Sequence, residues 1–570
     1  MSRPRERRAR PRISRHGGAP GWLWLPAAVG VAFLLLPIIG LTARIDIAHL
    51  GEVLVAPESR LAMGVSLGTS LIAAIVCVLI GFPLGCLLGS RPFRGHRILR
   101  TLILLPLVLP PVVSGLALLY TFGRTALIGS ALDSAGLGLA YTSAAVVFAQ
   151  VFVSLPFMVM SVETAVAARG RDFELTAAEL GARPTRVFVS ITLPLLRQGI
   201  ITGAILCFAR SLGEFGATLT FAGSLSGVTR TMPLQIYLVR ESDPRSAIAL
   251  SLLLIVVALV IIVIAYRSPH APKLDPARGM TTVDGPTVDG PTVEGPAVDL
   301  PEPTPVRHRK SPPSDLAEAD RGDGIRLQAR LAERGIDVDL ALPGSSTTAL
   351  IGRNGAGKSS LFSILTGALT ADSGLLRIGE STIFDVDAGR WPPVHARGIV
   401  HLGQNPLLFP HLTVVDNVAF GLRAHGAMRA AAREAAQEML DRLGVGHLSQ
   451  RRPDAVSGGQ AARIALARAL VIDPQLLLLD EPLAALDVDV KVETRRVLAQ
   501  ELHGRSAVLI THDVEDVTAL AETLVLIESG RVALVAPVGA VEPAPGEDSH
   551  DFLSSFCAMD RDGILCSRSQ

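Results

Sequence analysis

The sequence predicts a multi-domain chain in which an all-α polytopic membrane domain of about six helices precedes an α/β phosphate-loop domain. Three observations support this. Apolar residues make up 49% of the chain and are concentrated before residue 268, in runs long enough to cross a bilayer. From about residue 324, apolar strands alternate with helical segments. One such strand leads into residues 352–359, which have the spacing G-x-x-x-x-G-K-[ST] of a phosphate-binding loop.

Six apolar runs are candidate membrane spans, because a helix needs about 20 apolar residues to cross a bilayer. Pro106, Pro110 and Pro111 should bend the third run. The first run lacks a small-x-small cleavage site, so it is interpreted as a retained span rather than a cleaved signal peptide. We therefore expect a multi-pass protein of the cell membrane, in contact with lipid. The runs lie near residues 22–42, 62–89, 99–122, 140–165, 198–222 and 246–266.

Arginine placement predicts the orientation, because positive charge is enriched in cytoplasmic loops. With six spans, the arginine-rich segments before the first run, after the second and after the fourth all fall on the cytoplasmic side. The N-terminus and everything beyond residue 268 fall there too. A formal net charge of +1 gives no global field for nucleic acid, so no nucleic-acid partner is expected. The five cysteines form neither a disulfide framework nor a zinc-like cluster.

The loop between the fourth and fifth runs, near residues 172–197, predicts a short amphipathic helix. Phe173, Ala177 and Leu180 have helical spacing, and Gly181 should end that helix before the chain re-enters the membrane. An ordinary amphipathic helix at the membrane interface would show the same pattern.

Arg210 and Glu214 lie one helical turn apart inside the fifth run. Ionisable groups at this depth are costly and tend to face a bundle interior or a water-filled path. The sequence leaves two interpretations open: a mutual structural pair, or a direct role in the path of an anion.

Three segments are expected to lie outside the folded domains. Residues 1–21 form a basic cytoplasmic arm, and residues 541–570 a short tail. Residues 268–322 repeat Thr-Val-Asp-Gly-Pro and cannot build a core, which predicts a disordered Pro/Gly-rich linker with a reach of about 40 Å. The membrane domain is then 22–267 and the phosphate-loop domain 323–540. With only some 30 residues after position 540, we expect no further C-terminal β-domain.

The phosphate loop carries the most specific chemistry. Lys358 is one of only four lysines in a chain with 53 Lys plus Arg. Its compact ammonium can reach the terminal phosphates of a nucleotide better than a planar guanidinium. The glycines let backbone N–H groups turn inward, and the Ser359 hydroxyl can bind Mg²⁺. The sequence predicts ATP and Mg²⁺ as cofactors, with nucleotide contacts from Gly352, Arg353, Asn354, Gly355, Ala356, Gly357, Lys358, Ser359 and Ser360.

Two further strands should end at the same site. The strand at residues 476–479 leads into Asp480, which is placed to hold Mg²⁺, and Glu481, the natural general base for an attacking water. The strand at 507–510 leads to His512, which can reach the γ-phosphate and the water. Glu481 and His512 are the predicted catalytic residues. Ser457, Gly458, Gly459 and Gln460 begin a helix and form a candidate anion site.

In this order, the motifs resemble those of ABC transporters. Residues 457–460 resemble the ABC signature, which binds ATP held by the opposite ATPase copy; this implies a second copy of the same chain. Gln404 is similar to the residue that begins the Mg²⁺-sensing loop, and the resemblance makes it a metal and nucleotide contact. Asp487 resembles the loop that contacts the partner ATPase across the dimer.

The membrane half resembles bacterial ABC importer permeases. Residues 174–194 are similar to their coupling loop, E-A-A-x-x-x-G followed by I-x-L-P, which docks on the ATPase. Residues 209–237 resemble the molybdate importer permease. The resemblance implies a permease fused to its ATPase, working as a homodimer that imports an oxyanion delivered by a separate extracytoplasmic oxyanion-binding protein.

Molybdate is the expected cargo, and sulfate, thiosulfate or tungstate are the alternatives. A non-transport ATP-driven membrane complex would need large outer domains, yet the outer loops are short. A soluble ATPase with a regulatory membrane anchor would need only one or two spans.

Overall fold

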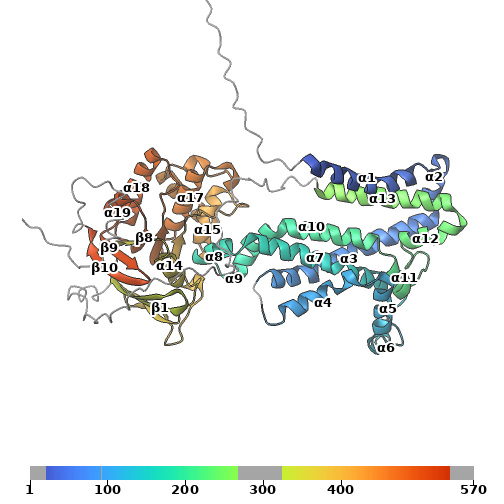
Figure 1. The fold of residues 1–570 in the computed structure, drawn as a ribbon, viewed down its shortest axis with the longest axis horizontal. Helices are drawn as coiled ribbons and strands as arrows, with labels where there is room; N and C mark the ends of the chain where they lie inside the picture. The colour runs from blue at the N-terminus through green and yellow to red at the C-terminus, as the bar shows by residue number, and fades with distance from the viewer. Residues whose placement is uncertain (1–20, 91–92, 267–323, 539–570) are drawn as a thin grey trace, which may run out of the picture. The chain divides into compact units, whose positions relative to one another are not determined.

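The computed structural model describes residues 21–90, 93–266 and 324–538 (Figure 1). These residues form two compact units. The first holds the described residues up to 169 and those from 197 to 266, and the second holds 170–196 and 324–538. The predicted basic arm, linker and tail lie outside the described residues, apart from Gly21, so their boundaries stay predictions.

The first unit is built of helices, which confirms the predicted all-α membrane domain. Among the described residues, five helical stretches are long and apolar enough to cross a bilayer, and a bent pair would make a sixth. Shorter helices, α2 (Ile47–Val55), α6 (Leu127–Ser134) and α12 (Met232–Ser242), lie between them. The five long stretches are α1 (Trp24–Thr42), α3 (Pro57–Gly89), α7 (Ser143–Arg169), the segment through α10 (Leu193–Leu212) and α13 (Pro244–Tyr266).

The third and fifth predicted spans are both broken. The third consists of α4 (His96–Val108) and α5 (Pro111–Phe122), which bend by 115° where prolines remove backbone donors, as predicted. The fifth, 198–222, is wrong as a single helix, because α10 ends at Leu212 and α11 (Gly216–Ala222) begins anew. The Oε1 atom of Glu214 accepts a hydrogen bond from Ala217 N at 2.9 Å and so stabilises the first turn of α11.

Helices α3 and α7 pack closely along a row of small residues. Gly81, Gly85 and Gly89 recur every four residues and therefore share one face of α3. A Cβ atom on Gly85 would lie 2.7 Å from Cβ of Val162, and one on Gly81 or Gly89 would lie 2.9 or 2.7 Å from the nearest α7 atom. Small residues let helix backbones approach in a membrane, where burial of apolar surface gives no driving force between helices.

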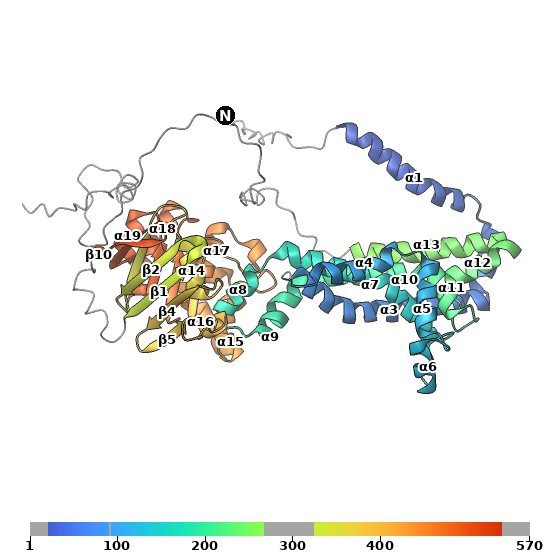
Figure 2. The ribbon, with the colours of Figure 1, turned by 60° about the horizontal axis from the view of Figure 1, so that its bottom comes forward.

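The second unit is an α/β domain, as predicted, and its strands form two sheets (Figure 2). The six-stranded sheet has the order β10-β9-β3-β8-β7-β6, with parallel pairing except between β9 and β10. Three of its strands are buried on both faces over almost their whole length: β3 (Thr347–Ile351), β7 (Leu476–Asp480) and β8 (Ala507–Ile510). The others are β6 (Ile399–Leu402), β9 (Thr523–Glu528) and β10 (Arg531–Pro537).

A four-stranded antiparallel sheet, in the order β2-β1-β4-β5, forms a second layer. Its strands are β1 (Ile325–Leu331), β2 (Ile336–Leu342), β4 (Ser373–Ile378) and β5 (Ser381–Asp385). Alternating burial along β1 and β2 points one face into the core. The helices of this unit are α14 (Lys358–Thr366), α15 (Val414–Ala424), α16 (Arg429–Arg442), α17 (Gly458–Leu470), α18 (Val488–Leu502) and α19 (Val514–Leu520).

Residues 170–196, which we call the docking loop, belong to the second unit by their contacts. The loop contains the predicted short helix, α8 (Asp172–Glu179), followed by a turn and α9 (Pro184–Val187). Gly181 ends the first helix at φ +84°, a left-handed conformation that other residues adopt only at a cost. Ala177, Leu180 and Ile191 are buried in one cluster with residues of α15 and α17.

Candidate nucleotide site and docking loop

The phosphate loop connects β3 to α14, as its sequence predicts. Gly352, Gly355 and Gly357 have φ of +152°, +85° and +103°, and a Cβ on Gly352 would lie 2.2 Å from the carbonyl oxygen of Ile527. Glycine is therefore required for this path. Lys358 opens α14, and its Nζ donates to the carbonyls of Gly352 and Arg353 at 2.5 and 3.1 Å. The loop's N–H groups, the helix N-terminus and the ammonium together favour a phosphate group.

The predicted hydrolysis residues come together at the carboxyl ends of neighbouring parallel strands. β8 lies between β3 and β7, so the loops after all three meet at one edge of the sheet. His512 Nε2 lies 3.3 Å from Glu481 Oε1. Glu481 itself has φ +49°, an uncommon conformation that directs the chain away from β7. A carboxylate and an imidazole thus stand beside the phosphate loop.

Asp480 interacts electrostatically with Glu481, Lys358 and His512. Its pKa is raised, first by burial and then by the neighbouring Glu481 carboxylate, while Lys358 and His512 act in the opposite direction. A bound cation would stabilise the charged form of such a buried carboxylate. Ser359, Asp480 and Gln404 offer only oxygen ligands, which Mg²⁺ prefers, and Gln404 follows β6, the strand paired with β7. The donor set fits Mg²⁺.

The signature residues form the start of α17. Ser457 and Gln460 make a capping box, in which the Ser457 side chain accepts from Gln460 N and the Gln460 side chain accepts from Ser457 N. Ser457 and Gly458 are exposed. Gly459 packs near Leu486, which precedes the exposed Asp487, the N-cap residue of α18. These two predicted inter-subunit elements therefore stand together on an exposed part of the second unit.

The docking loop is anchored to the ATP-binding unit by polar contacts that the sequence did not predict. Arg186 Nη1 donates to the carbonyl of Arg423 at 2.5 Å, and His411 Nε2 donates to the carbonyl of Ser190 at 2.7 Å. Burial lowers the pKa of His411, although the Ser190 carbonyl opposes this. The neutral ring is therefore favoured at this contact.

Arg468 is the second feature missed from sequence, and it joins three elements. From the buried face of α17 it donates to the carbonyls of Leu407 and Pro406, each at 2.9 Å, and its guanidinium lies 5.1 Å from the Phe409 ring centre. Glu179 of the docking loop interacts with it electrostatically. Arg468 follows the signature by three helical turns and lies on the apolar face of α17. An arginine at an apolar position is unusual, and this is the sequence signal that could have identified it.

Glu179 is buried, with 8% of its surface exposed. Burial raises its pKa to about 8, even though the positive charge of Arg468 acts to lower it. The desolvation of the carboxylate therefore outweighs the attraction to the guanidinium.

The comparisons with known proteins match both halves of the chain. Residues 336–484 match the ABC transporter family, and residues 81–273 match the family of binding-protein-dependent transport system inner membrane components. The molybdenum transport permease ModB of Mycobacterium tuberculosis is 52% identical over 251 residues, 44% of this chain and 95% of that protein. The molybdenum import ATP-binding protein ModC of the same organism is 41% identical over 227 residues, 39% of this chain.

The chain spans 62% of that ModC protein. An aliphatic sulfonates import ATP-binding protein, SsuB 2 of Xanthomonas axonopodis, is 43% identical over 217 residues, 37% of this chain and 68% of that protein. The helical unit and the phosphate-loop unit thus define an ABC transporter with permease and ATP-binding parts in one polypeptide. The chain belongs to the binding-protein-dependent inner membrane transport family. It is a multi-pass membrane protein with a cytoplasmic ATPase domain, and it couples ATP hydrolysis to transport.

Proposed function

We propose that this protein imports molybdate across the cell membrane, driven by ATP and Mg²⁺. The observation that carries the proposal is the match of the helical half to nearly the full length of a molybdenum transport permease. The second half matches a molybdenum import ATP-binding protein, which agrees with this cargo. The SsuB 2 match concerns the ATP-binding half, which lies outside the helical unit, so it bears less on cargo.

The working unit would be a homodimer supplied by an extracytoplasmic oxyanion-binding protein. Exposure of the signature at Ser457 and Gly458 supports this, because a second copy could then place its ATP against them. In this scheme Lys358 and the loop amides hold the phosphates, while Ser359, Asp480 and Gln404 hold Mg²⁺, which neutralises phosphate charge. Glu481 accepts a proton from the attacking water, and His512 orients that water and the γ-phosphate.

The docking loop would carry the movement of the ATPase to the permease. Arg186 of the loop contacts Arg423 of α15, and Glu179 interacts with Arg468 of α17. A shift of either helix would therefore move α8. ATP binding would close the ATPase pair and open the membrane path outward, and hydrolysis would reset it.

The cargo is tested by uptake of labelled molybdate into cells that lack other importers and express this chain with its binding protein. We expect uptake that needs Glu481 and is not blocked by an equal concentration of sulfate. Tungstate, which has nearly the same size and charge, should compete. If sulfate at equal concentration abolished uptake, the assignment to molybdate would be wrong.

A further inference from the structure

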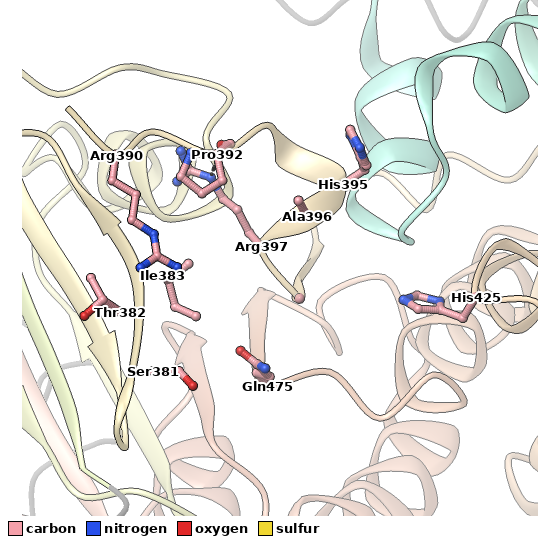
Figure 3. Close-up of a pocket in the computed structure, with 11 residues that line it drawn as sticks. Ser381, Thr382, Ile383, Arg390, Pro392, His395, Ala396, Arg397, His425 and Gln475 are labelled. Carbon is pink, nitrogen blue, oxygen red and sulfur yellow. Dashed lines mark hydrogen bonds between the residues drawn. The ribbon is translucent and has the colours of Figure 1, made fainter.

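The second unit has a hollow beside the docking loop that the nucleotide chemistry does not use. It has a volume of about 390 Å³. Figure 3 shows Ser381 and Arg390 on one side, His395 and His425 on the other, and Gln475 below. Of the described residues that line it, none is an aspartate or a glutamate. A hollow with hydroxyl, amide, imidazole and guanidinium groups and no lining carboxylate has the chemistry of an anion site.

Arg397 adds a buried positive charge to the wall. Only 1% of its surface is exposed, and its Nη1 and Nε donate to the carbonyls of Ile364, Leu365 and Pro392. The guanidinium also lies 4.1 Å from the Trp391 ring centre. Its Nη2 has no hydrogen-bond partner among the described residues.

Burial alone lowers the Arg397 pKa, to about 10, so the side chain remains charged at neutral pH. No ion pair to a described carboxylate balances it, whereas a buried cation is ordinarily paired. An anion in the adjoining hollow would balance the charge of Arg397 by electrostatic attraction. Arg390 and the imidazoles would make the direct contacts with that anion.

The hollow is also connected to the docking loop. His395 lies in the turn Val394–Ala396, which packs against α8. The His425 ring rests on Gly181, where an added Cβ would lie 2.4 Å from Cε1, and its Nδ1 donates to the carbonyl of Gly421 at 2.9 Å. Because both imidazoles touch the surroundings of α8, a ligand held between them would resist movement of the loop.

We propose that this hollow binds a tetrahedral oxyanion on the cytoplasmic side and thereby regulates the contact between the ATPase and the docking loop. The same chemistry has two sources: the imported oxyanion, in which case the inference rests on the proposed function, and inorganic phosphate released by ATP hydrolysis. Both are compact and negatively charged, and both accept several charge-assisted hydrogen bonds.

The test uses the full chain purified in lipid nanodiscs, in a Lys358→Ala background that removes phosphate binding at the nucleotide site. Molybdate and inorganic phosphate are titrated separately by calorimetry. Arg390→Gln and His395→Gln should each weaken binding by about tenfold, because the first removes a charge-assisted contact and the second a ring N–H donor. Arg496→Gln, an exposed site on α18 with the same charge change, is the matched control and should bind like the parent.

A second readout keeps the wild-type nucleotide site. The oxyanion that binds should change the ATPase rate of the wild-type chain and of Arg496→Gln, but not of Arg390→Gln. Unaltered thermal melting curves would show that the variants fold. For this reason the exposed Arg390 and the half-buried His395 are replaced rather than the buried Arg397.

The two arms separate the sources. Binding of molybdate alone identifies the imported oxyanion, binding of phosphate alone identifies the hydrolysis product, and binding of both identifies a general oxyanion site; each must be lost in Arg390→Gln. Absence of binding by both ions at 10 mM, or binding unaffected by Arg390→Gln and His395→Gln, overturns the proposal. A chain that fails to transport molybdate yet binds phosphate here would refute the proposed cargo and leave the site standing.

Discussion

The Nε2 atom of His512 lies 3.3 Å from the Oε1 atom of Glu481, although the two residues follow different strands of the sheet. The strand order β3-β8-β7 brings them together, since parallel strands place their carboxyl ends at one edge. The pair stands next to Asp480, whose carboxylate interacts electrostatically with Glu481, His512 and Lys358. We propose that this pair acts on the water that attacks the terminal phosphate of ATP.

Replacing Glu481 with Gln should keep ATP binding and reduce ATP turnover by about 10²–10⁴-fold, because the amide cannot accept the proton of the attacking water. Turnover is measured by phosphate release, and binding by equilibrium dialysis of labelled ATP. Glu528→Gln, at the end of β9, is a control that should hydrolyse normally. Rapid hydrolysis by Glu481→Gln would refute its role as the base.

Glu179→Gln should change how stability depends on pH. The pKa of Glu179 in the folded protein is about 8, above its value of 4.5 in an unfolded chain, so the folded state binds the extra proton between these values. The contribution of Glu179 to the free energy of unfolding is therefore fully present below about pH 4.5 and is lost as the pH rises toward 8. Because Gln cannot ionise, the variant should lack this component.

Melting temperatures of the wild-type chain and of Glu179→Gln, recorded at pH 5 and pH 8, measure that difference. We expect the wild-type midpoint to fall by about 2–4 °C more than that of the variant for each kcal/mol lost. Equal pH dependence in the two proteins would show that Glu179 is not buried against Arg468 in the docked loop.

Gly181→Val should uncouple hydrolysis from uptake. A side chain there is strained at φ +84° and would collide with the His425 ring, so α8 could not seat on the ATPase. ATP binding should persist while substrate uptake into vesicles falls at least about tenfold. Gly170→Val is a matched control: its φ is +70°, yet no described atom lies within 4 Å of an added Cβ. Equal uptake by both variants would argue against the docking contact.

The Arg210–Glu214 pair should prove structural. Nη1 of Arg210 lies 2.6 Å from Oε2 of Glu214, whose side chain is only 2% exposed. Glu214 also accepts a hydrogen bond that stabilises the first turn of α11. Removing Arg210 would leave the buried Glu214 carboxylate uncompensated, so Arg210→Gln alone should cost about 3–5 kcal/mol, and Glu214→Gln added to it should restore part of the loss. Unfolding measured through a double-mutant cycle gives the coupling. A stable double variant that no longer transports would place Arg210 in the path of the anion instead.

Local patterns in the sequence were sufficient for most elements. Apolar length predicted the membrane helices, and the glycine spacing predicted the phosphate loop, because each depends on residues within a few positions of one another. Glu214 could not be interpreted this way. The sequence is apolar on both sides of Glu214 and so predicts one continuous helix. In the structure its side chain accepts a hydrogen bond from Ala217 N, in the first turn of a new helix.

The sequence by itself determined the two kinds of domain, the phosphate loop and the short helix ending at Gly181, since spacing and backbone preference act locally. Only the tertiary structure decided that Arg468 holds the carbonyls of Pro406 and Leu407 beside Glu179, and that a basic hollow opens near His395 and His425. These residues are distant along the chain. Packing of helices on the sheet brings them together, and the energy of a buried charge depends on that packing rather than on its sequence neighbours.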